Sequence, residues 1–359
     1  MTRAHIADPH IIQKILERRE DQIRPCVGMG YCIDSIYNGQ AVCIHNAATG
    51  REGHLPQLVP KSTGPARKVV VVGAGPGGLE AARVAAERGH TVIVFEAAQH
   101  AGGQILTAAA LKRRREILGI VDWRLSELAR LGVEIRYNHY AEAEDVLAAD
   151  PDYVVIATGG LPNTDFLRSG AEFATTSWDV LNGVAKVSGS VLVYDENGSH
   201  PGMTIAEFVA NTTNQLEVIT PERTLAIDIG ATSYPPYFKT LNQVGAKITL
   251  NLRLESVERR GNKLVGIFDD EYAGVRVEKD ADYIVVENGT LPMEDLYFSL
   301  KEHSINGGAV DYNALLEGET QAIERNPEKR FRLFRIGDAV ASRNIHAAIY
   351  DAHRLMINA

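Results

Sequence analysis

Cysteine is scarce in this sequence of 359 residues, and it has neither long apolar stretches nor blocks of like charge. No apolar stretch approaches the ~18 residues that a membrane-spanning helix needs. The first ten residues, MTRAHIADPH, lack the basic, apolar and small-residue order of a signal peptide. The formal net charge of −9 is spread along the chain. Nucleic acids and anionic membranes select basic faces, so neither is expected as a partner. We expect a cytoplasmic protein whose ligand occupies a local site.

Three cysteines occur, Cys26, Cys32 and Cys43, and their clustering is informative. An odd number of cysteines in a cytosolic protein does not describe a disulfide framework, whereas closely spaced cysteines there more often bind metal or carry out redox chemistry. The spacing is close to the ferredoxin-like pattern Cys-x2-Cys-x2-Cys-x11/12-Cys, with Met29 where the second cysteine would stand. We predict that the three cysteines bind an iron–sulfur cluster of the [4Fe–4S] or [3Fe–4S] type.

Methionine is neutral and a poor substitute for a thiolate, so the fourth iron of a [4Fe–4S] cluster would need another ligand. His45 is a candidate because it is close by in the sequence. Zinc is an alternative metal, since three cysteines and a histidine can close a tetrahedral site. A loop that keeps its fold without any metal is the remaining alternative.

The rest of the composition is typical of a globular protein, with 45% hydrophobic and 23% charged residues and enough length for two domains. Residues 1–24 contain a helical pattern, and the stretch from Arg24 to about Pro65 is predicted to be irregular. A loop-rich stretch of that length needs something to hold it. The helical pattern is centred on Ile11, Ile12, Ile15 and Leu16.

From Lys68 the sequence reads as a buried strand, a glycine turn, an alanine-rich helix and a second buried strand, which is one βαβ unit. A helix at about 110–130 and strands at 133–136 and 153–158 continue the alternation. The sheet should therefore be largely parallel.

A second, smaller α/β series begins at Ser190. Its expected elements are a strand from 190, a helix near 203–213, a strand at 216–220, a helix near 235–244 and a strand at 247–250. Residues 253–286 alternate apolar and polar side chains between two turns, which is typical of an antiparallel meander. The last segment, RFRLFRIGDAVASRNIHAAIYDAHRLM, returns to a strand followed by a helix.

The glycine turn has the spacing of a dinucleotide-binding motif, Gly73-Ala74-Gly75-Pro76-Gly77-Gly78, and it lies directly between a strand and a helix. Glycines permit a tight turn and close backbone approach, and the helix N-terminus offers free N–H groups to a pyrophosphate. Glu96 closes the second strand, where a carboxylate can accept hydrogen bonds from both hydroxyls of an adenosine ribose and disfavours a 2′-phosphate. The alternative is a glycine turn that is only structural.

Three short motifs indicate a flavin dinucleotide, FAD or its ADP half. Each follows a strand in the order that a long dinucleotide would run, and an aspartate at the last one can bond a ribityl chain. The motif residues are Gly103 and Gln104, Thr158 and Gly159, and Gly337 and Asp338.

With these residues assembled, the sequence resembles the C-terminal half of the trimethylamine dehydrogenase and 2,4-dienoyl-CoA reductase family, and most of all its N-methylproline, stachydrine and dimethylglycine demethylase-like branch. The segments that carry the resemblance cover practically the whole chain: ADPHIIQKI (7–15), RPCVGMGYCIDSIYNGQAVCIHNAATGRE (24–52), VVGAGPGGLEAARVAAERGH (71–90), GGQ (102–104), ATGG (157–160) and RIGDAVASRNIHAAIYDA (335–352).

The resemblance implies an α/β fold of two Rossmann-like, glutathione-reductase-like nucleotide-binding domains, the second inserted in the first, behind a loop-rich iron–sulfur segment. The expected divisions are residues 1–66 for the iron–sulfur segment, 67–186 with 290–359 for the FAD- or ADP-binding domain, and 187–289 for the inserted domain. It also implies that His346 lies near a flavin edge, although a histidine on such a helix is more often simply packed and hydrogen-bonded.

In the family this half follows a barrel that binds FMN and the substrate, and the sequence contains no such barrel. Arg3 matches an arginine that holds the FMN phosphate in full-length relatives. Either a partner chain supplies the FMN barrel or the chain is a truncated product. The resemblance implies oxidative N-demethylation of a small methylated amine or amino acid, assembly into an oligomer, and an electron-transfer flavoprotein as a candidate acceptor.

The inserted domain departs from the related reductases at the turn Tyr194–Gly202, which has lost the glycine spacing and carries two acids, Asp195 and Glu196. Carboxylates repel a pyrophosphate, so direct NAD(P)H binding is doubtful. The alternatives to an electron-relaying subunit are a stand-alone NAD(P)H:flavin oxidoreductase and a non-catalytic module that binds ADP as a structural ligand. The sequence identifies no catalytic acid or base.

Overall fold

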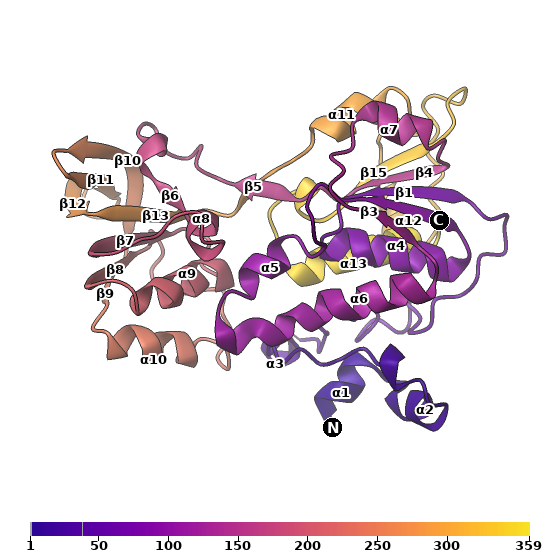
Figure 1. Ribbon diagram of the computed structural model, residues 1–359, viewed down its shortest axis with the longest axis horizontal. Coiled ribbons are helices and arrows are strands. Elements are labelled where there is room, and N and C mark those ends of the chain that lie inside the picture. The colour runs from indigo at the N-terminus through magenta and orange to yellow at the C-terminus, as the bar shows by residue number, and fades with distance from the viewer. Residues whose placement is uncertain (1, 38) are drawn as a thin grey trace. The chain divides into compact units, whose positions relative to one another are not determined.

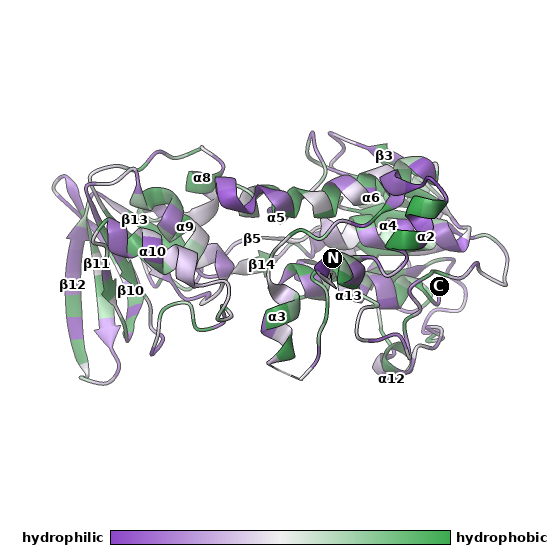
Figure 2. Cartoon of the chain, turned by 90° about the horizontal axis from the view of Figure 1, so that it is seen from below, coloured by the Kyte–Doolittle hydropathy of each residue, from purple (hydrophilic) through white to green (hydrophobic). Residues whose placement is uncertain are grey.

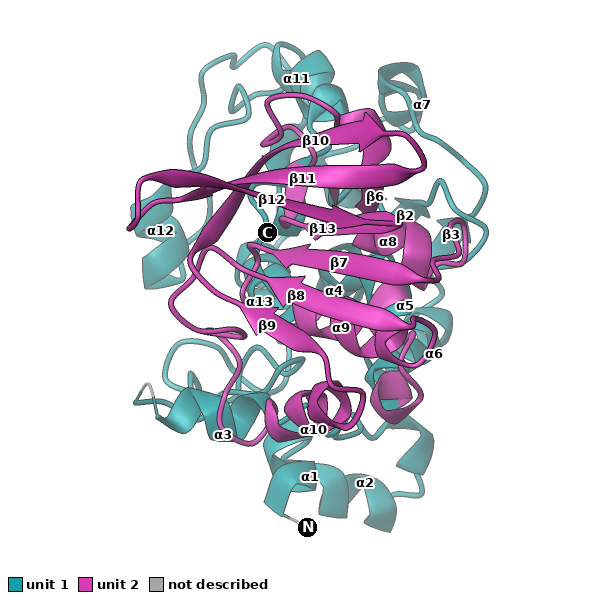
Figure 3. Cartoon of the chain, turned by 90° about the vertical axis from the view of Figure 1, so that its left-hand side faces the viewer, with its two compact units in different colours: residues 1–106, 116–160, 292–359 teal, residues 107–115, 161–291 magenta. Residues whose placement is uncertain are grey.

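The computed structural model describes residues 2–37 and 39–359 and divides the chain into two compact units, drawn in separate colours in Figure 3. Unit 1 comprises residues 1–106, 116–160 and 292–359, and unit 2 comprises residues 107–115 and 161–291. The expected fold class, an α/β unit inserted within another, is confirmed. The residue limits that the sequence suggests for the domains remain a prediction.

Unit 1 is built on a five-stranded parallel sheet of order β15-β4-β1-β2-β3. Its central strand, β1, carries four consecutive valines that are all buried, as expected for a strand covered by helices on both faces. The strands are β1 (Lys68–Val72), β2 (Thr91–Phe95), β3 (Glu134–Arg136), β4 (Tyr153–Ile156) and β15 (Arg332–Arg335). The parallel sheet predicted from the sequence is confirmed.

Helices α4 (Pro76–Arg88), α6 (Gly119–Arg130) and α13 (Ile345–Met356) lie on one face of this sheet, and α7 (Ala143–Ala148) and α11 (Asp295–Lys301) lie on the other (Figure 1). Alanines fill the packing positions of α4, so its backbone can approach the sheet and the neighbouring helices closely. Unit 1 also contains α12 (Tyr312–Glu317) and η4 (Gly337–Ala339), whereas α5 (Gln104–Ala108) and η2 (Lys112–Leu118) each cross a limit between the two units.

The N-terminal segment of unit 1 contains α1 (Thr2–Ala7), α2 (Ile11–Leu16), η1 (Glu20–Gln22) and α3 (Tyr31–Ile36). The helical pattern around Ile11 is confirmed as α2. The expectation that the whole stretch from Arg24 to Pro65 is irregular is wrong, because α3 forms within it after Gly30, which takes a left-handed conformation at φ +74°.

Unit 2 contains a second parallel sheet, of order β6-β13-β7-β8-β9, and a three-stranded antiparallel sheet, β10-β11-β12. Its strands are β6 (Thr175–Thr176), β7 (Ser190–Asp195), β8 (Gln215–Ile219), β9 (Lys247–Thr249), β10 (Leu252–Arg260), β11 (Lys263–Asp270), β12 (Val275–Ala281) and β13 (Tyr283–Glu287). Its helices are η3 (Ala171–Phe173), α8 (Ser177–Leu181), α9 (His200–Ala210) and α10 (Pro235–Gln243).

The prediction that residues 253–286 form an antiparallel meander includes one strand too many. Residues 252–281 form it, but β13 leaves it and pairs in parallel with β7. The core of unit 2 explains the difference, because Ile284 and Val286 pack with the meander whereas Val285 packs with α9, so the strand is buried on both faces.

Two short strands, β5 (Gly160–Pro162) and β14 (Thr290–Pro292), pair where the chain passes from one unit to the other. Of the helices in the described part of the chain, none is long and apolar enough to cross a membrane.

Candidate functional site

The turn between β1 and α4 is so tight that a side chain at Gly73 or Gly78 would collide with backbone, and one at Gly77 would be crowded. A Cβ at Gly73 would lie 2.4 Å from the backbone oxygen of Ala157, and Gly73 takes a φ of +102°. A Cβ at Gly78 would lie 1.9 Å from the backbone oxygen of Gly73, and one at Gly77 would lie 3.2 Å from the backbone oxygen of Ala348. These glycines let α4 start directly against the ends of β1 and β4 and against α13.

Gly75 differs from its neighbours, because nothing in the protein requires glycine there. Its backbone is extended, at φ −73° and ψ −178°, which any residue adopts, and a Cβ built on it would meet no atom within 4 Å. A ligand that must approach the backbone closely gives a reason for the missing side chain. Pro76 follows as the first residue of α4, where its fixed φ suits the helix and leaves the following N–H groups free to bind an anion.

Glu96 holds this turn from the end of β2. Its Oε2 accepts a hydrogen bond from the backbone N–H of Ala74 at 2.6 Å, and its Oε1 accepts one from Ala98 at 2.7 Å. The side chain is only half-buried, and each carboxylate oxygen can accept a further bond. The arrangement fits a carboxylate that braces the turn and also accepts the hydroxyls of a ribose.

The other predicted motifs lie beside the same turn. A Cβ at Gly103 would lie 3.3 Å from the Cα of Gly75. Gln104 donates from Nε2 to Oδ2 of Asp338 at 2.9 Å, although the two residues are 234 positions apart in the sequence. Oδ1 of Asp338 accepts the backbone N–H of Arg343 at 3.1 Å. The carboxylate of Asp338 is thus fixed in place next to the glycine turn.

Thr158 and Gly159 follow β4, whose C-terminal end adjoins the glycine turn. Oγ1 of Thr158 donates to the backbone oxygen of Met293 at 2.6 Å, and the backbone oxygen of Gly159 accepts the N–H of Met293. Gly159 and Gly337 both take a left-handed φ, at +73° and +60°. The predicted dinucleotide residues therefore gather at the carboxyl ends of the parallel strands, and they fit FAD or its ADP half.

His346 is buried on α13, and both of its ring nitrogens have partners within the protein. Arg51 can only donate, so Nε2 of His346 accepts from it at 3.1 Å, and Nδ1 donates to the backbone oxygen of Cys43 at 2.8 Å. Burial and the neighbouring Arg51 lower the pKa of His346 to about 4, so the imidazole is neutral at neutral pH. The ring also stacks on Tyr350 and contacts Tyr31. His346 thereby attaches the cysteine loop to α13, and a role for it at a flavin remains a prediction.

The three cysteines of the loop differ in their environments. Cys26 is exposed, Cys32 is half-buried and Cys43 is buried. Backbone N–H groups of His45 and Asn46 bond the sulfur of Cys43, but burial is the larger effect and raises the pKa of its thiol. Cys43 by itself is therefore a neutral thiol at neutral pH.

No three His, Cys, Asp or Glu side chains within residues 2–37 and 39–359 lie close enough together to hold a metal ion. His45, the candidate fourth ligand, is otherwise engaged: Nε2 donates to the backbone oxygen of Pro25 at 2.7 Å, and Nδ1 faces a guanidinium nitrogen of Arg124 at 3.5 Å. The residues as they stand do not form a cluster site, so the iron–sulfur cluster remains a prediction from the sequence.

A buried charge network under the glycine turn was not predicted from the sequence. Glu80 on α4 accepts from Arg83 at 2.7 Å, from Arg124 on α6 at 2.8 Å and from His353 on α13 at 2.9 Å. Arg124 also donates to the backbone oxygen of His45 at 2.9 Å. These arginines hold the pKa of the Glu80 carboxyl well below its usual range in spite of its burial. The network joins α4, α6 and α13 to the cysteine loop. The only signal for it in the sequence is Glu80, a charged residue among the alanines of α4.

In unit 2 the carboxylate of Asp195, the last residue of β7, occupies the turn that follows this strand. Oδ1 of Asp195 accepts the backbone N–H groups of Asn197 at 3.0 Å and Gly198 at 3.1 Å. A Cβ at Gly202 would lie 2.1 Å from the carboxyl carbon of Asp195, so the acid packs directly against the start of α9. Burial, with the nearby Glu287, raises the pKa of Asp195 to about 7. The place where a pyrophosphate would approach the helix is thus taken by a carboxyl group, and this turn does not fit NAD(P)H.

Known proteins resemble the chain over almost its whole length. The model of the family described as pyridine nucleotide-disulphide oxidoreductase matches residues 67–323. The chain is 50% identical over 357 residues to the probable N-methylproline demethylase of Rhizobium meliloti, covering 99% of this chain and 52% of that protein. It is 44% identical over 371 residues to the N,N-dimethylglycine/sarcosine dehydrogenase of Chromohalobacter salexigens, covering 99% and 53%.

A solved structure, the 6-hydroxypseudooxynicotine amine oxidase of Pseudomonas geniculata N1, superposes with a TM-score of 0.83 at 25% identity and covers 98% of this chain and 51% of that one. The chain spans about half the length of the curated relatives it matches. The predicted resemblance to amine demethylases and dehydrogenases is confirmed, and with it the oxidoreductase class and the flavoprotein character. The chain belongs to the pyridine nucleotide-disulphide oxidoreductase family.

Proposed function

We propose that the chain is a redox flavoprotein module in the oxidative N-demethylation of a small methylated amine or amino acid, with FAD or its ADP half bound at residues 73–78. The observation that carries the proposal is Gly75, a glycine that the protein's own packing does not require, at the point where a pyrophosphate would approach α4. Two relatives whose names describe demethylation or dehydrogenation of methylated amino acids support the substrate class.

The residues of unit 1 divide the task of binding. The first N–H groups of α4 receive the pyrophosphate, and Glu96 receives the ribose of the adenosine half. Asp338, fixed by Gln104, is placed to bond the chain beyond the pyrophosphate. The isoalloxazine of FAD supplies hydride and single-electron chemistry when it is bound, whereas the protein supplies orientation and electrostatics.

Substrate oxidation itself belongs, in this proposal, to an FMN-binding barrel. The relatives are about twice as long as this chain, which leaves room for such a half within the same protein or in a partner. An electron-transfer flavoprotein is the proposed acceptor, and the assembly is proposed to be an oligomer. No electron route through an iron–sulfur cluster is assigned, because the described cysteines do not form a metal site.

The experiment mixes this chain anaerobically with the half of the Rhizobium meliloti relative that this chain does not match. N-methylproline is the substrate, a one-electron dye is the electron acceptor, and reduction of the dye is measured. We expect the dye to be reduced only when both polypeptides are present. We expect the rate of dye reduction to fall when the Gly75→Ala variant is used in place of the unsubstituted chain. Equal dye reduction by the other half alone would show that this chain carries no electrons. NADH in place of the amine tests the reductase alternative, and the carboxylate-filled turn at Asp195 predicts that NADH does not bleach the flavin.

A further inference from the structure

Unit 2 contains a cleft of about 370 Å³ at the amino ends of the parallel strands β7 and β8, where the start of β11 and the end of β12 complete its lining. Sites that take small molecules measure roughly 300–1,000 Å³. Ligands of parallel sheets usually bind at the carboxyl ends of the strands, which is the end where Asp195 lies. The cleft is therefore separate from the nucleotide-type turn of unit 2. The charged residues in its lining are Glu217, Lys263, Asp280 and Asp282.

Asp282 forms a fixed wall of the cleft. Its Oδ2 accepts the backbone N–H of Ser190 at 2.8 Å and the hydroxyl of Ser190 at 2.9 Å, and its Oδ1 pairs with Nζ of Lys263 at 2.7 Å. Gly189 allows this close approach, because a Cβ there would lie 2.4 Å from Oδ2 of Asp282. Lys263, together with the bonds from Ser190, lowers the pKa of Asp282 to about 2, so this carboxylate is ionised at neutral pH.

Glu217 on β8 supplies a second carboxylate, and its side chain is only 14% exposed. Its Oε1 accepts from Oγ1 of Thr249 at 2.6 Å and from Nζ of Lys279 at 2.7 Å. Burial raises the pKa of Glu217, but the bonds from Lys279 and Thr249 outweigh burial and hold the pKa below its usual value. Oε2 takes part in neither bond, so one oxygen of an ionised carboxylate remains for a donor in the cleft.

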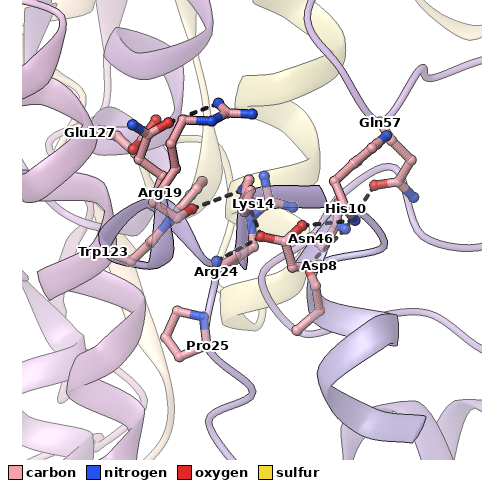
Figure 4. Close-up of polar contacts among 12 residues, drawn as sticks. Asp8, His10, Lys14, Arg19, Arg24, Pro25, Asn46, Gln57, Trp123 and Glu127 are labelled. Carbon is pink, nitrogen blue, oxygen red and sulfur yellow. Dashed lines mark hydrogen bonds and ion pairs between the residues drawn. The ribbon is translucent and has the colours of Figure 1, made fainter. Parts of the chain in front are cut away.

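Asp280, near the end of β12, has no such partner. Its carboxylate makes no hydrogen bond or ion pair with the residues that the structure describes. Figure 2 shows it among the hydrophilic residues of β12, which are purple. The buried Asp8 of unit 1 illustrates the usual alternative (Figure 4), since its Oδ1 accepts the backbone N–H of His10 at 3.1 Å and its Oδ2 accepts from Lys14 at 2.6 Å. Of the acids that line the cleft, Asp280 is thus the one without a cation.

The charges of the lining decide the class of ligand. Lys263 and Lys279 each pair with one of the other two carboxylates. Lys247 also lies 3.3 Å from Glu217. Asp280 is therefore left for a single positive charge from outside the chain, whereas Lys263, the ammonium group of the lining, is already bound. A ligand with a carboxylate of its own fits less well than a plain monocation.

Two further observations narrow the kind of cation. Within residues 2–37 and 39–359, no three His, Cys, Asp or Glu side chains could hold a metal ion, so a bare metal ion does not fit. No aromatic side chain is among the described residues of the lining, whereas a quaternary ammonium, which has no N–H group, is recognised by aromatic faces. Carboxylates form their strongest hydrogen bonds with charged N–H donors, which a protonated amine supplies.

We propose that the cleft binds a small organic monocation with N–H groups, a protonated primary or secondary amine, between Asp280 and Glu217. The inference goes beyond the proposed function, because it assigns a second site in unit 2. It holds whether or not unit 1 binds a flavin.

The test is a binding measurement on the whole chain with dimethylammonium as the probe and tetramethylammonium as the cation that lacks N–H groups. Dissociation constants are measured by NMR titration, and sodium chloride keeps the ionic strength constant. We expect dimethylammonium to bind at least about tenfold more tightly than tetramethylammonium. Asp280→Asn should weaken the binding of dimethylammonium about tenfold, and it loses no contact within the described chain.

The matched control is Asp269→Asn on β11, which removes an equal charge from the same antiparallel sheet outside the cleft and should leave binding unchanged. Circular dichroism of the same samples shows whether each variant is folded, and their nucleotide content shows the state of unit 1 separately. Equal affinity for the two cations would mean that no N–H group is recognised and would overturn the proposed ligand. Failure of the unsubstituted chain to bind dimethylammonium, or an equal loss in Asp269→Asn, would overturn the site.

Discussion

At the scale of single residues, Gly75 is the glycine of the turn whose lack of a side chain is explained by the proposed ligand and not by packing within the protein. Gly73 and Gly78 could not be replaced without moving backbone, whereas a methyl group at Gly75 would point into open space. We expect Gly75→Ala to change the free energy of unfolding by less than about 1 kcal/mol. We expect the same change to lower the fraction of nucleotide-loaded protein at least tenfold, which denaturation and chromatography of the released nucleotide would measure.

Gly53 provides the matched control for this substitution, because its added Cβ would also meet no atom within 4 Å and its φ is not positive. Gly53→Ala should keep both stability and nucleotide. Full nucleotide content in Gly75→Ala would mean that the pyrophosphate does not lie against this position.

Asp195 gives a prediction about pH. Its pKa is raised from 3.8 to about 7, so the folded chain keeps a proton that the unfolded chain releases between these values. The stability from this group is full below the unfolded pKa and is lost as pH rises through the folded one. Asp195→Asn keeps the acceptor for Asn197 and Gly198 and cannot ionise. The melting temperature of the variant relative to the parent should therefore rise between pH 5 and pH 8, and a difference that stays flat would contradict the raised pKa.

At the scale of elements, Glu80 joins α4, α6 and α13. Removing its charge leaves Arg83 and Arg124 buried without their shared partner. We expect Glu80→Gln to lower the free energy of unfolding by about 3 kcal/mol or more, measured by urea denaturation. Glu258→Gln is the control, since Glu258 pairs with Arg260 at the exposed surface and should cost less than about 1 kcal/mol. Similar losses in the two variants would mean that the buried network contributes no more than a surface pair.

The elements that the sequence predicts well are those with a strong local period. The valine run of β1, the glycine turn and the alanine-rich α4 are all encoded within one short stretch, and so is the repeat of strand and helix from Ser190. The strand β13 was assigned to the meander because its apolar run continues the alternation, and only its distant pairing with β7 decides otherwise.

In the candidate site, too, the residues of a local motif could be predicted from the sequence, whereas contacts between distant residues could not. The glycines and Glu96 belong to a compact motif, but the partner of His346 is Arg51, 295 positions away, and no sequence pattern links them. The neutral state of His346 and the engagement of His45 with Pro25 and Arg124 likewise depend on burial and long-range packing.

At the scale of the whole molecule, the two units each contain a five-stranded parallel sheet, but the turns that follow their central strands β1 and β7 differ. In unit 1, Gly75 precedes α4 and has free space where a side chain would be. In unit 2, the carboxylate of Asp195 packs against the start of α9. Under the proposed function the chain therefore binds one dinucleotide, in unit 1. The chain spans about half the length of the curated relatives it matches, and the proposed function assigns substrate oxidation to a second half.

The central claim, that unit 1 holds a flavin dinucleotide, is tested most directly by the absorbance spectrum of freshly purified, anaerobic protein, followed by identification of the nucleotide released on denaturation and an assay of iron and acid-labile sulfide. The account predicts flavin absorbance and about one FAD per chain, and iron with sulfide in the same sample would support the cluster predicted from the sequence. A colourless protein that releases only ADP would contradict the redox function and leave an assembly module, and a protein that releases no nucleotide would contradict the site itself.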